Sequence, residues 1–301
     1  MRAVTIHGFG DEDVLSIDDV PTPQPGEQQV RVKVAAAAVN RADINTRTRV
    51  YPIPAPGPEG YRLGMDASGV VDAVGSGVSG LQTGDNVIGF SDSPLQVGAQ
   101  AEYVVLPTDA VTSAPRAVPL VQAATLPLNG LTATQALQAA GLSQGGTVVV
   151  TGAAGGLGMF VVQLARLAGH HVVAWVKQDT DADYVRSLGA DAVITGPTAA
   201  TSRTADAVID AATIGQDTID LIRDGGTYVA FRQIAPTLDR GISQVDIGVH
   251  TDGAVLARLV RLVDAGELRL PDVVEMPLGD VAAAQHKLHS GGTRKRFVLV
   301  P

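Results

Sequence analysis

The chain has 301 residues, of which 45% are hydrophobic and 18% are charged. A chain of this length exceeds what one hydrophobic core usually organises, so we expect a folded protein of two domains. The net charge of -9 repels a phosphate backbone and argues against nucleic acid as a partner. The absence of cysteine excludes disulfide bonds, thiolate nucleophiles and zinc sites that need sulfur.

Short basic, histidine and apolar segments add little to this picture. The triplet "RKR" at residues 294–296 is either a solvated strand end or a small binding patch. His170 and His171 are adjacent and point to different faces of a strand, so we predict no metal site. The first residues lack the apolar core of a signal peptide, and polar residues interrupt the charge-free stretch 117–165. We therefore expect a cytoplasmic protein with no membrane span.

The first part of the chain, residues 1–118, is predicted to be a β-rich domain. Short apolar runs separated by turns begin with "AVTIHGFG", "VLSIDDV" and "QVRVKVAAAAV". In the third run Val30, Val32 and Val34 alternate with polar residues, which is typical of a strand with one buried face. The segment Tyr51 to Gly64, "YPIPAPGPEGYRLG", contains too many prolines for a helix and is predicted to be a surface loop.

Residues 119–250 alternate between strand-like and helix-like segments. The strands include "GTVVVTG", "HHVVAWV", "DAVIT", "ADAVIDAA" and "TYVAFR", and the helices include "MFVVQLARLAG", "ADYVRSLGA" and "QDTIDLIRDGG". Such alternation predicts an α/β domain with a doubly wound parallel sheet covered by helices on both faces.

Residues 251–301 return to the earlier pattern. They open with the amphipathic helix "DGAVLARLVRLVDAGEL", which Thr251 or Asp252 is placed to cap. Strand-like "RLPDVVEMPL", helical "DVAAAQHKLHSG" and a last strand "RFVLVP" follow. The two ends of the chain would then form one β-rich domain with the α/β domain inserted between them.

The segment "VVVTGAAGGLGMFVVQ", residues 148–163, joins a predicted strand to a predicted helix through a glycine-rich loop. Glycines allow the backbone to approach a pyrophosphate, and a helix amino end supplies unpaired N–H groups and a positive dipole end. We predict a dinucleotide site; a tight turn without a ligand, or a methyltransferase loop, are the alternatives. The candidate residues are Gly152, Ala154, Gly155, Gly156, Leu157 and Gly158.

Lys177 follows the next predicted strand, where NAD-selective proteins usually carry an acidic residue. A cation there attracts a 2′-phosphate, so NADPH is predicted as the cofactor in preference to NADH. The alternative is a lysine that merely ends a strand in water.

Metal chemistry is not expected from this composition. An alcohol dehydrogenase commonly stabilises an alkoxide with a metal ion. A quinone, or an alkene conjugated to a carbonyl, accepts hydride more easily, and the developing oxyanion needs only hydrogen bonds and a proton. The predicted activity is reduction of such an acceptor, a small molecule.

The chain resembles the zinc-independent medium-chain dehydrogenases/reductases of the NADPH:quinone oxidoreductase branch. The similarity runs nearly end to end through "AAAAVNRADINTR", "LGMDASGVVDAVGSGVSGLQTGDNVIGF", "GAQAEYVVLP", "AATLPLNGLTATQAL" and "GGTVVVTGAAGGLGMFVVQLARLAG". This resemblance implies a GroES-like catalytic domain with an inserted Rossmann domain, and often a homodimer. Zinc-bearing relatives have a His-Glu pair where this chain reads "GMD" at residues 64–66.

The resemblance also implies roles for individual residues. Asn40 would face the nicotinamide, Thr132 would lie by the nicotinamide or its ribose, and Gly155, Gly156 and Leu157 would line the pyrophosphate. Asn40 closing a turn and Thr132 capping a helix are the simpler alternatives.

Three departures from the relatives concern the phosphate and the substrate. Asp181 and Gly196 stand where related quinone reductases often carry a lysine and a tyrosine for the 2′-phosphate. A tyrosine that some relatives have near Asn45 is absent, which leaves Tyr51 as the candidate for substrate contact or proton donation, with ordered water as the alternative. Two other functions stay open: an enoyl-thioester reductase, and a non-catalytic, redox-sensing NADPH-binding protein.

Overall fold

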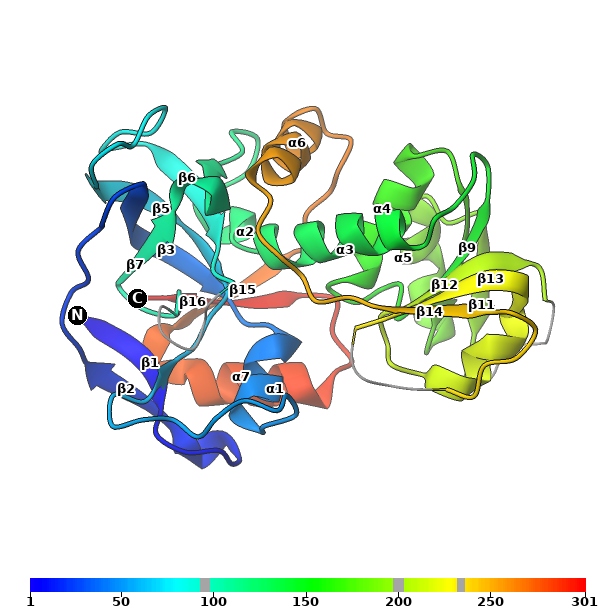
Figure 1. Cartoon of the computed structure of the whole chain (residues 1–301), viewed down its shortest axis with the longest axis horizontal. Helices are drawn as coiled ribbons and strands as arrows, with labels where there is room; N and C mark the ends of the chain where they lie inside the picture. The colour runs from blue at the N-terminus through cyan, green and yellow to red at the C-terminus, as the bar shows by residue number, and fades with distance from the viewer. Residues whose placement is uncertain (93–97, 197–202, 232–235) are drawn as a thin grey trace. The chain divides into compact units, whose positions relative to one another are not determined.

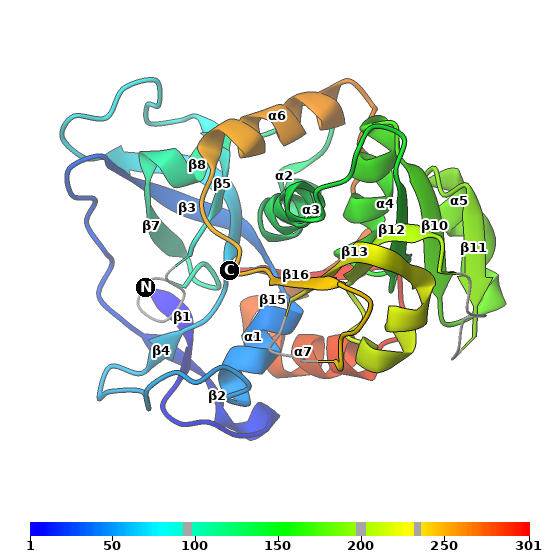
Figure 2. The same cartoon turned by 45° about the vertical axis from the view of Figure 1, so that its right-hand side comes forward.

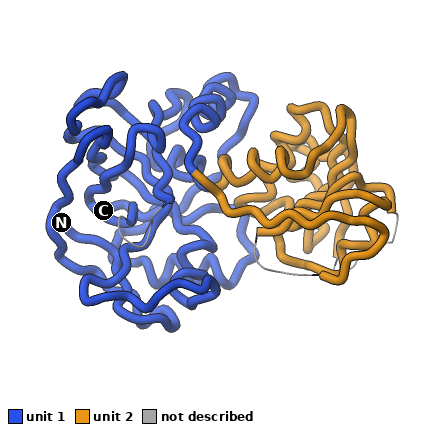
Figure 3. The backbone as a smooth tube through the Cα atoms, viewed as in Figure 1, with its two compact units in different colours: residues 1–128, 251–301 blue, residues 129–250 orange. Residues whose placement is uncertain are grey.

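The computed structural model describes residues 1–92, 98–196, 203–231 and 236–301 (Figure 1). The chain forms two compact units (Figure 3). Unit 1 consists of Met1–Leu128 and Thr251–Pro301, and unit 2 consists of Asn129–His250. The second unit is thus inserted into the first, as the sequence pattern suggested. No helix in the described ranges is long and apolar enough to cross a membrane.

The first boundary between the units lies between Leu128 and Asn129, whereas the sequence prediction placed it between residues 118 and 119. The intervening residues belong with unit 1 because they are bonded to its strands. Ser68 Oγ donates to the Leu120 carbonyl oxygen over 2.7 Å, and the Leu128 N–H donates to Asp66 over 2.6 Å. The second boundary, between His250 and Thr251, is the same in the structure and the prediction.

Unit 1 is built on two sheets. One has the strand order β2-β1-β4 and the other β15-β16-β3-β5-β6-β8, with β7 also paired to β3. The strands and helices of its first segment are β1 (Arg2–Ile6), η1 (Glu12–Val14), β2 (Leu15–Asp19), β3 (Gln29–Ala38), α1 (Arg41–Arg47), β4 (Tyr61–Arg62), β5 (Asp66–Val74), β6 (Asn86–Phe90), β7 (Tyr103–Pro107), η2 (Thr108–Ala110), β8 (Val111–Ser113) and α2 (Leu120–Ala123).

Strand β3 explains why the larger sheet forms. Its alternating Val30, Val32 and Val34 are buried in one apolar core, as the period of two predicted. Because β3 pairs with β5, β7 and β16, both chain segments of unit 1 share this strand. The proline-rich segment Tyr51 to Gly64 forms no helix and contains only the short strand β4.

The second segment of unit 1 contains α6 (Gly253–Asp264), β15 (Val273–Pro277), η5 (Leu278–Asp280), α7 (Val281–Ser290) and β16 (Arg296–Val300). Asp252 caps α6, since its Oδ1 accepts from the Val255 N–H over 2.9 Å. Thr251, the other predicted cap, donates instead to Asp92 over 3.1 Å.

Unit 2 contains one parallel sheet with the strand order β11-β10-β9-β12-β13-β14. This order reverses direction next to β9, as in a doubly wound fold. Helix α3 (Pro127–Ala139) leads into it. Its other elements are β9 (Thr147–Thr151), α4 (Gly158–Leu167), β10 (His171–Val176), η3 (Asp179–Asp181), α5 (Ala182–Ser187), β11 (Ala192–Thr195), β12 (Ala205–Asp210), η4 (Gly215–Leu221), β13 (Ile222–Ala230) and β14 (Ser243–Asp246).

Apolar side chains hold the helices of unit 2 against its sheet. Helix α4 packs along β9 and β10, and α5 packs against β11 (Figure 2). Ile219 and Leu221 of η4 join a buried cluster with Val149, Val208 and Tyr228 of the sheet. The strands therefore run as nearly continuous apolar segments, as expected of a parallel sheet.

Two elements of unit 2 differ from the sequence prediction. The segment "QDTIDLIRDGG" was predicted to be a helix, but only residues up to Leu221 are helical, as a 3-10 helix, and β13 begins at Ile222. Strand β14, on the edge of the sheet, was not predicted at all. Ile222 pairs with Ala205 of β12, so pairing in the sheet overrides the local helical spacing.

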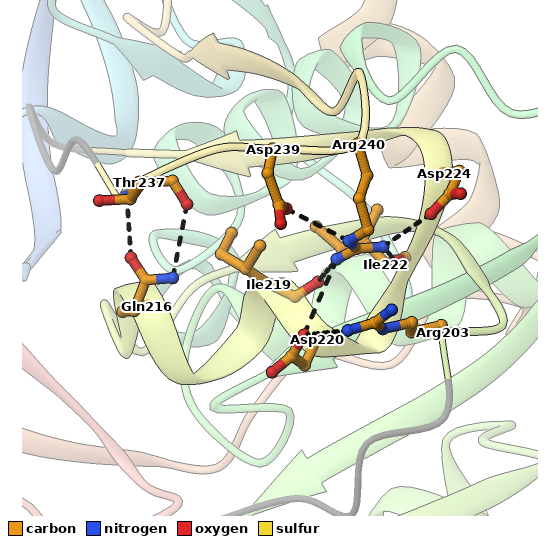
Figure 4. A network of polar contacts seen from close by, with 9 residues as sticks. All are labelled: Arg203, Gln216, Ile219, Asp220, Ile222, Asp224, Thr237, Asp239 and Arg240. Atoms are coloured by element: carbon orange, nitrogen blue, oxygen red, sulfur yellow. Dashed lines mark hydrogen bonds and ion pairs between the residues drawn. The ribbon is translucent and has the colours of Figure 1, made fainter.

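Arg240 organises the amino end of β13 and the chain that leads to β14 (Figure 4). Its guanidinium donates to the carbonyl oxygens of Ile222 and Ile219 over 2.7 and 2.9 Å, and to the Asp224 carboxylate over 3.1 Å. Nearby, Gln216 exchanges hydrogen bonds with the backbone of Thr237. The Arg240 contacts lie at the amino end of β13, whereas Gln216 follows Gly215, which donates to Asp210 at the carboxyl end of β12.

Candidate functional site

The glycine-rich loop lies at the carboxyl end of β9 and leads directly into α4. Gly152 has a φ of +58°, and a Cβ there would lie 3.1 Å from Ala212 Cβ. A Cβ at Gly158 would collide with the Gly152 carbonyl oxygen. The loop can thus turn this tightly only because these two positions carry no side chain.

The loop presents unpaired donors at the amino end of α4. No described residue accepts a hydrogen bond from the N–H groups of Ala154, Gly156, Leu157 or Gly158. The Gly155 N–H, in contrast, donates to the Gly152 carbonyl oxygen over 2.8 Å. The Gly155 N–H therefore stabilises the turn, and the other four N–H groups are of the kind that binds an anion at a helix end. The dinucleotide contacts predicted for the loop residues, Gly155 included, stay predictions.

Lys177 directly follows β10, the strand that pairs with β9. Its side chain is exposed, and its backbone stands at the same carboxyl edge of the sheet as the glycine loop. Asp181 ends η3, and Gly196 accepts a hydrogen bond from the Trp175 indole over 2.9 Å. The structure thus brings the predicted lysine and the loop to one edge of unit 2.

Asp210 is a buried residue of this edge that the sequence analysis did not identify. It ends β12, and its carboxylate accepts hydrogen bonds from Thr151 Oγ1 over 2.6 Å and from Tyr228 Oη over 2.7 Å. Burial, followed by this contact with Asp210, raises the pKa of Tyr228 far above its usual range, so the phenol stays a donor. The only sequence signal was an acidic residue at the end of an apolar strand.

Thr132 lies within α3, at the start of unit 2, and is 8% exposed. It stands well inside the helix, which begins at Pro127, so it is not the cap of that helix. Its predicted contact with the nicotinamide remains a prediction.

In unit 1, Asn40 belongs to a buried network. Its Nδ2 donates to Asp66 Oδ2 over 2.7 Å, and its Oδ1 accepts from Arg296 Nη2 over 2.7 Å. Arg296 also donates to the Val39 carbonyl oxygen over 2.8 Å. Asn40 is 2% exposed and directly precedes α1, which agrees with the predicted role at a turn. Its predicted place beside the nicotinamide stays a prediction.

A second carboxylate extends this network. Asp43 Oδ2 accepts from the Asn40 N–H over 2.7 Å and from Gln100 Nε2 over 3.0 Å. Burial raises the pKa of Asp43 and of Asp66 to about 7, although hydrogen bonds and the Arg296 charge oppose this effect. Sequence reasoning placed Asp66 only as a departure from the zinc-bearing relatives and did not identify Asp43. It took Arg296 as part of a solvated strand end or a binding patch, which is wrong for this residue, since Arg296 is 8% exposed and bonds to Asn40.

Tyr51, the other candidate catalytic residue, lies close to Asn45. Asn45 Nδ2 donates to Tyr51 Oη over 3.1 Å, and Asn45 is buried on α1. No described residue accepts a hydrogen bond from the Tyr51 phenol. Since its oxygen already accepts from Asn45, the phenolic hydrogen is available to another acceptor.

The described residues contain no group of three or more His, Cys, Asp or Glu side chains that is able to hold a metal ion.

Residues 26–116 match the family described as "Alcohol dehydrogenase GroES-like domain", and residues 188–299 match "Zinc-binding dehydrogenase". The chain is 31% identical to the NADPH-dependent alkenal/one oxidoreductase of Arabidopsis thaliana, over the whole chain and 80% of that protein. The protein belongs to the quinone oxidoreductase branch of the medium-chain dehydrogenase/reductase superfamily. It is accordingly an oxidoreductase, and its two units are the GroES-like and Rossmann domains of this family.

Solved structures that are similar to the whole chain include an alcohol dehydrogenase and a quinone oxidoreductase. A NAD-dependent alcohol dehydrogenase has a TM-score of 0.87 and 28% identity, and the match covers all of both chains. The quinone oxidoreductase from Coxiella burnetii has a TM-score of 0.84 and 28% identity, and covers all of this chain and 99% of its own. The alcohol dehydrogenase is NAD-dependent and the alkenal/one oxidoreductase is NADPH-dependent, so a nicotinamide cofactor follows from the family but its phosphorylation state does not.

Proposed function

We propose that the protein binds NADPH at the glycine loop and reduces a quinone or an α,β-unsaturated carbonyl compound by hydride transfer, without a metal ion. The observation that carries this proposal is the row of N–H groups at Gly156, Leu157 and Gly158, which reach no acceptor among the described residues and lie at the amino end of α4. Backbone donors and a positive helix end suit a pyrophosphate. When bound, the reduced nicotinamide supplies the hydride.

NADPH is proposed in preference to NADH because of Lys177. A lysine at the end of β10 supplies a positive charge for a 2′-phosphate, whereas an acidic residue there would repel it. The similarity to an NADPH-dependent oxidoreductase supports the same choice.

The acceptor class follows from the chemistry that the chain can offer. Hydride addition to a conjugated carbonyl leaves an oxyanion that must then take up a proton. We propose that Tyr51 donates this proton, because its phenolic hydrogen is available and Asn45 orients its oxygen. The similarity to an alkenal/one oxidoreductase and to a quinone oxidoreductase supports these acceptors.

Cofactor binding and turnover test the proposal separately. Titration of the purified protein with NADPH and NADH should show tighter binding of NADPH. Quinones, alkenals and enoyl thioesters are then offered, and oxidation of the cofactor is followed by absorbance. Oxidation by enoyl thioesters alone would support an enoyl-thioester reductase, and tight binding without oxidation would support a redox-sensing protein. Failure to bind either nucleotide would contradict the proposal.

The role of Tyr51 has its own test. Tyr51→Phe should lower kcat while leaving NADPH affinity unchanged, because the variant loses only the hydroxyl group, which donates the proton and accepts from Asn45. Tyr61→Phe is the matched control, since the Tyr61 phenol donates to the Pro54 carbonyl oxygen in the same exposed loop. An unchanged kcat for Tyr51→Phe would favour ordered water as the proton donor.

A further inference from the structure

Asp210 connects three strands and a turn at the carboxyl edge of unit 2. Besides Thr151 and Tyr228, its carboxylate accepts from the N–H groups of Gly215 over 2.8 Å and Ile214 over 3.0 Å. The side chain is 2% exposed, so these bonds form away from water. One carboxylate thus joins the ends of β9, β12 and β13 to the turn at residues 211–215.

This turn holds Thr213 in a conformation that its side chain disfavours. Thr213 has a φ of +62°, which is rare for a residue branched at Cβ. Its N–H donates to the Asp210 carbonyl oxygen over 3.3 Å, and the next two N–H groups donate to the Asp210 carboxylate. The bonds to Asp210 therefore offset the local strain. Such strain tends to persist at functional sites, where the surrounding structure maintains it.

The turn also lies against the glycine loop. The Ala212 N–H donates to Thr151 Oγ1 over 2.9 Å, while Thr151 Oγ1 donates to Asp210. Ala212 Cβ would lie 3.1 Å from a Cβ at Gly152. A movement of the turn would consequently displace Thr151 and Gly152 at the start of the glycine loop.

A second aspartate on the same strand shows that joining the strands does not require this arrangement. Asp206, at the amino end of β12, accepts from the Thr147 N–H of β9 over 2.7 Å and from Arg223 over 2.6 Å. It joins the same three strands, β9, β12 and β13, without a strained turn. The additional contacts of Asp210 occur only at the edge where open parallel sheets bind ligands.

We propose that Asp210 is a positioning residue of the nucleotide site: through Thr151 and the turn at residues 211–215, it holds the glycine loop in its binding conformation. This inference rests on the proposed binding of a nicotinamide dinucleotide at that loop. Asp210 acts through other residues and is not assigned a contact with the cofactor.

The first experiment compares Asp210→Asn with Asp206→Asn in the full chain. NADPH binding is measured by isothermal titration calorimetry, acceptor KM by steady-state kinetics, and folding by thermal unfolding. Asp210→Asn should weaken NADPH binding about tenfold or more while acceptor KM changes little, because charge-assisted bonds to the turn are lost. Asp206→Asn should lower the melting temperature and leave NADPH affinity unchanged. Equal effects of the two variants on affinity would overturn the proposal.

The second experiment tests the connecting hydroxyl. Thr151→Val removes the hydroxyl with nearly the same shape, and Thr151→Ser retains it. NADPH affinity should fall in the valine variant and largely return in the serine variant. This pair decides the matter if Asp210→Asn does not fold, and equal affinities of the two Thr151 variants would refute the proposal. If the wild-type protein itself bound neither NADPH nor NADH, the proposed function would fail instead.

Discussion

The buried network around Asn40 in unit 1 and the glycine loop of unit 2 differ in where their hydrogen bonds end. Around Asn40, the amide lies between Asp66 and Arg296, and each of these bonds joins two protein groups. At the glycine loop, the N–H groups of Gly156, Leu157 and Gly158 reach no described acceptor. Buried side chains that bond mainly to one another maintain a shape, although Arg296 Nε and Gln100 Oε1 in this network have no described partner. A row of unpaired donors at a helix end, in contrast, suits an anion.

The largest expected effect concerns the cation of the network in unit 1. Arg296→Met should destabilise the protein by about 3–5 kcal/mol, because removing one partner leaves buried polar groups uncompensated. Chemical denaturation measures this loss. Arg2→Met is the control: Arg2 and Glu102 form an exposed pair, so the change should stay below about 1 kcal/mol. Similar losses of stability in both variants would show that burial of the network does not increase its contribution to stability.

The pH dependence of stability should also originate in unit 1. Asp43 and Asp66 have a folded pKa of about 7, above the ordinary value of 3.8. The folded state therefore binds more protons than the unfolded state between these values, and their contribution to stability falls as pH rises from about 4 to 7. Asp43→Asn should flatten this fall by on the order of 3 kcal/mol, measured by denaturation at several pH values.

Asp206, whose pKa is shifted in the opposite direction, serves as the control. The hydrogen bonds from Arg223 and the Thr147 N–H hold the pKa of Asp206 below its usual range. Its contribution is present above the unfolded pKa and is lost as pH falls. Asp206→Asn should thus reduce stability at neutral pH and matter little in acid. A pH profile unchanged by Asp43→Asn would contradict the assignment of the titration to the network.

A smaller effect is expected where the glycine loop is tightest. Gly158→Ala should cost about 1–3 kcal/mol through overpacking, although alanine favours a helix, and should weaken NADPH binding. The reason is the collision of the new Cβ with the Gly152 carbonyl oxygen. Gly248→Ala is the control in the same unit, because nothing lies within 4 Å of a Cβ there. Thermal unfolding measures the stability and calorimetric titration measures the NADPH affinity. If Gly158→Ala changed neither more than Gly248→Ala does, the tight turn would be disproved.

The smallest expected effect tests whether Lys177 makes the protein prefer NADPH to NADH. Lys177→Ala should weaken NADPH binding about tenfold, the usual scale for one lost charge-assisted hydrogen bond, and NADH binding much less. Gln178→Ala, at the next exposed position, should change neither affinity. Titration of both nucleotides measures this, and an equal loss for the two would exclude a phosphate contact of Lys177.

Local sequence patterns predicted the central strands and helices of both units better than the ends of elements and the edge strand of the parallel sheet. The alternation of Val30, Val32 and Val34 identified β3, and the strand, loop and helix around Gly152 were identified correctly. The helix predicted for residues 216–226 was wrong beyond Leu221, and β14 was missed. Both errors lie where pairing with a distant strand decides the conformation, which a period along the chain does not contain.

The sequence by itself determined the glycine loop, because a tight turn before a helix depends on neighbours in the chain. Only the tertiary structure decided how the polar residues are used. Asn40 meets Asp66 across 26 positions and Arg296 across 256, and Asp210 meets Thr151 across 59. A buried polar group must find a partner wherever the fold brings one, and that partner is not determined by spacing along the chain.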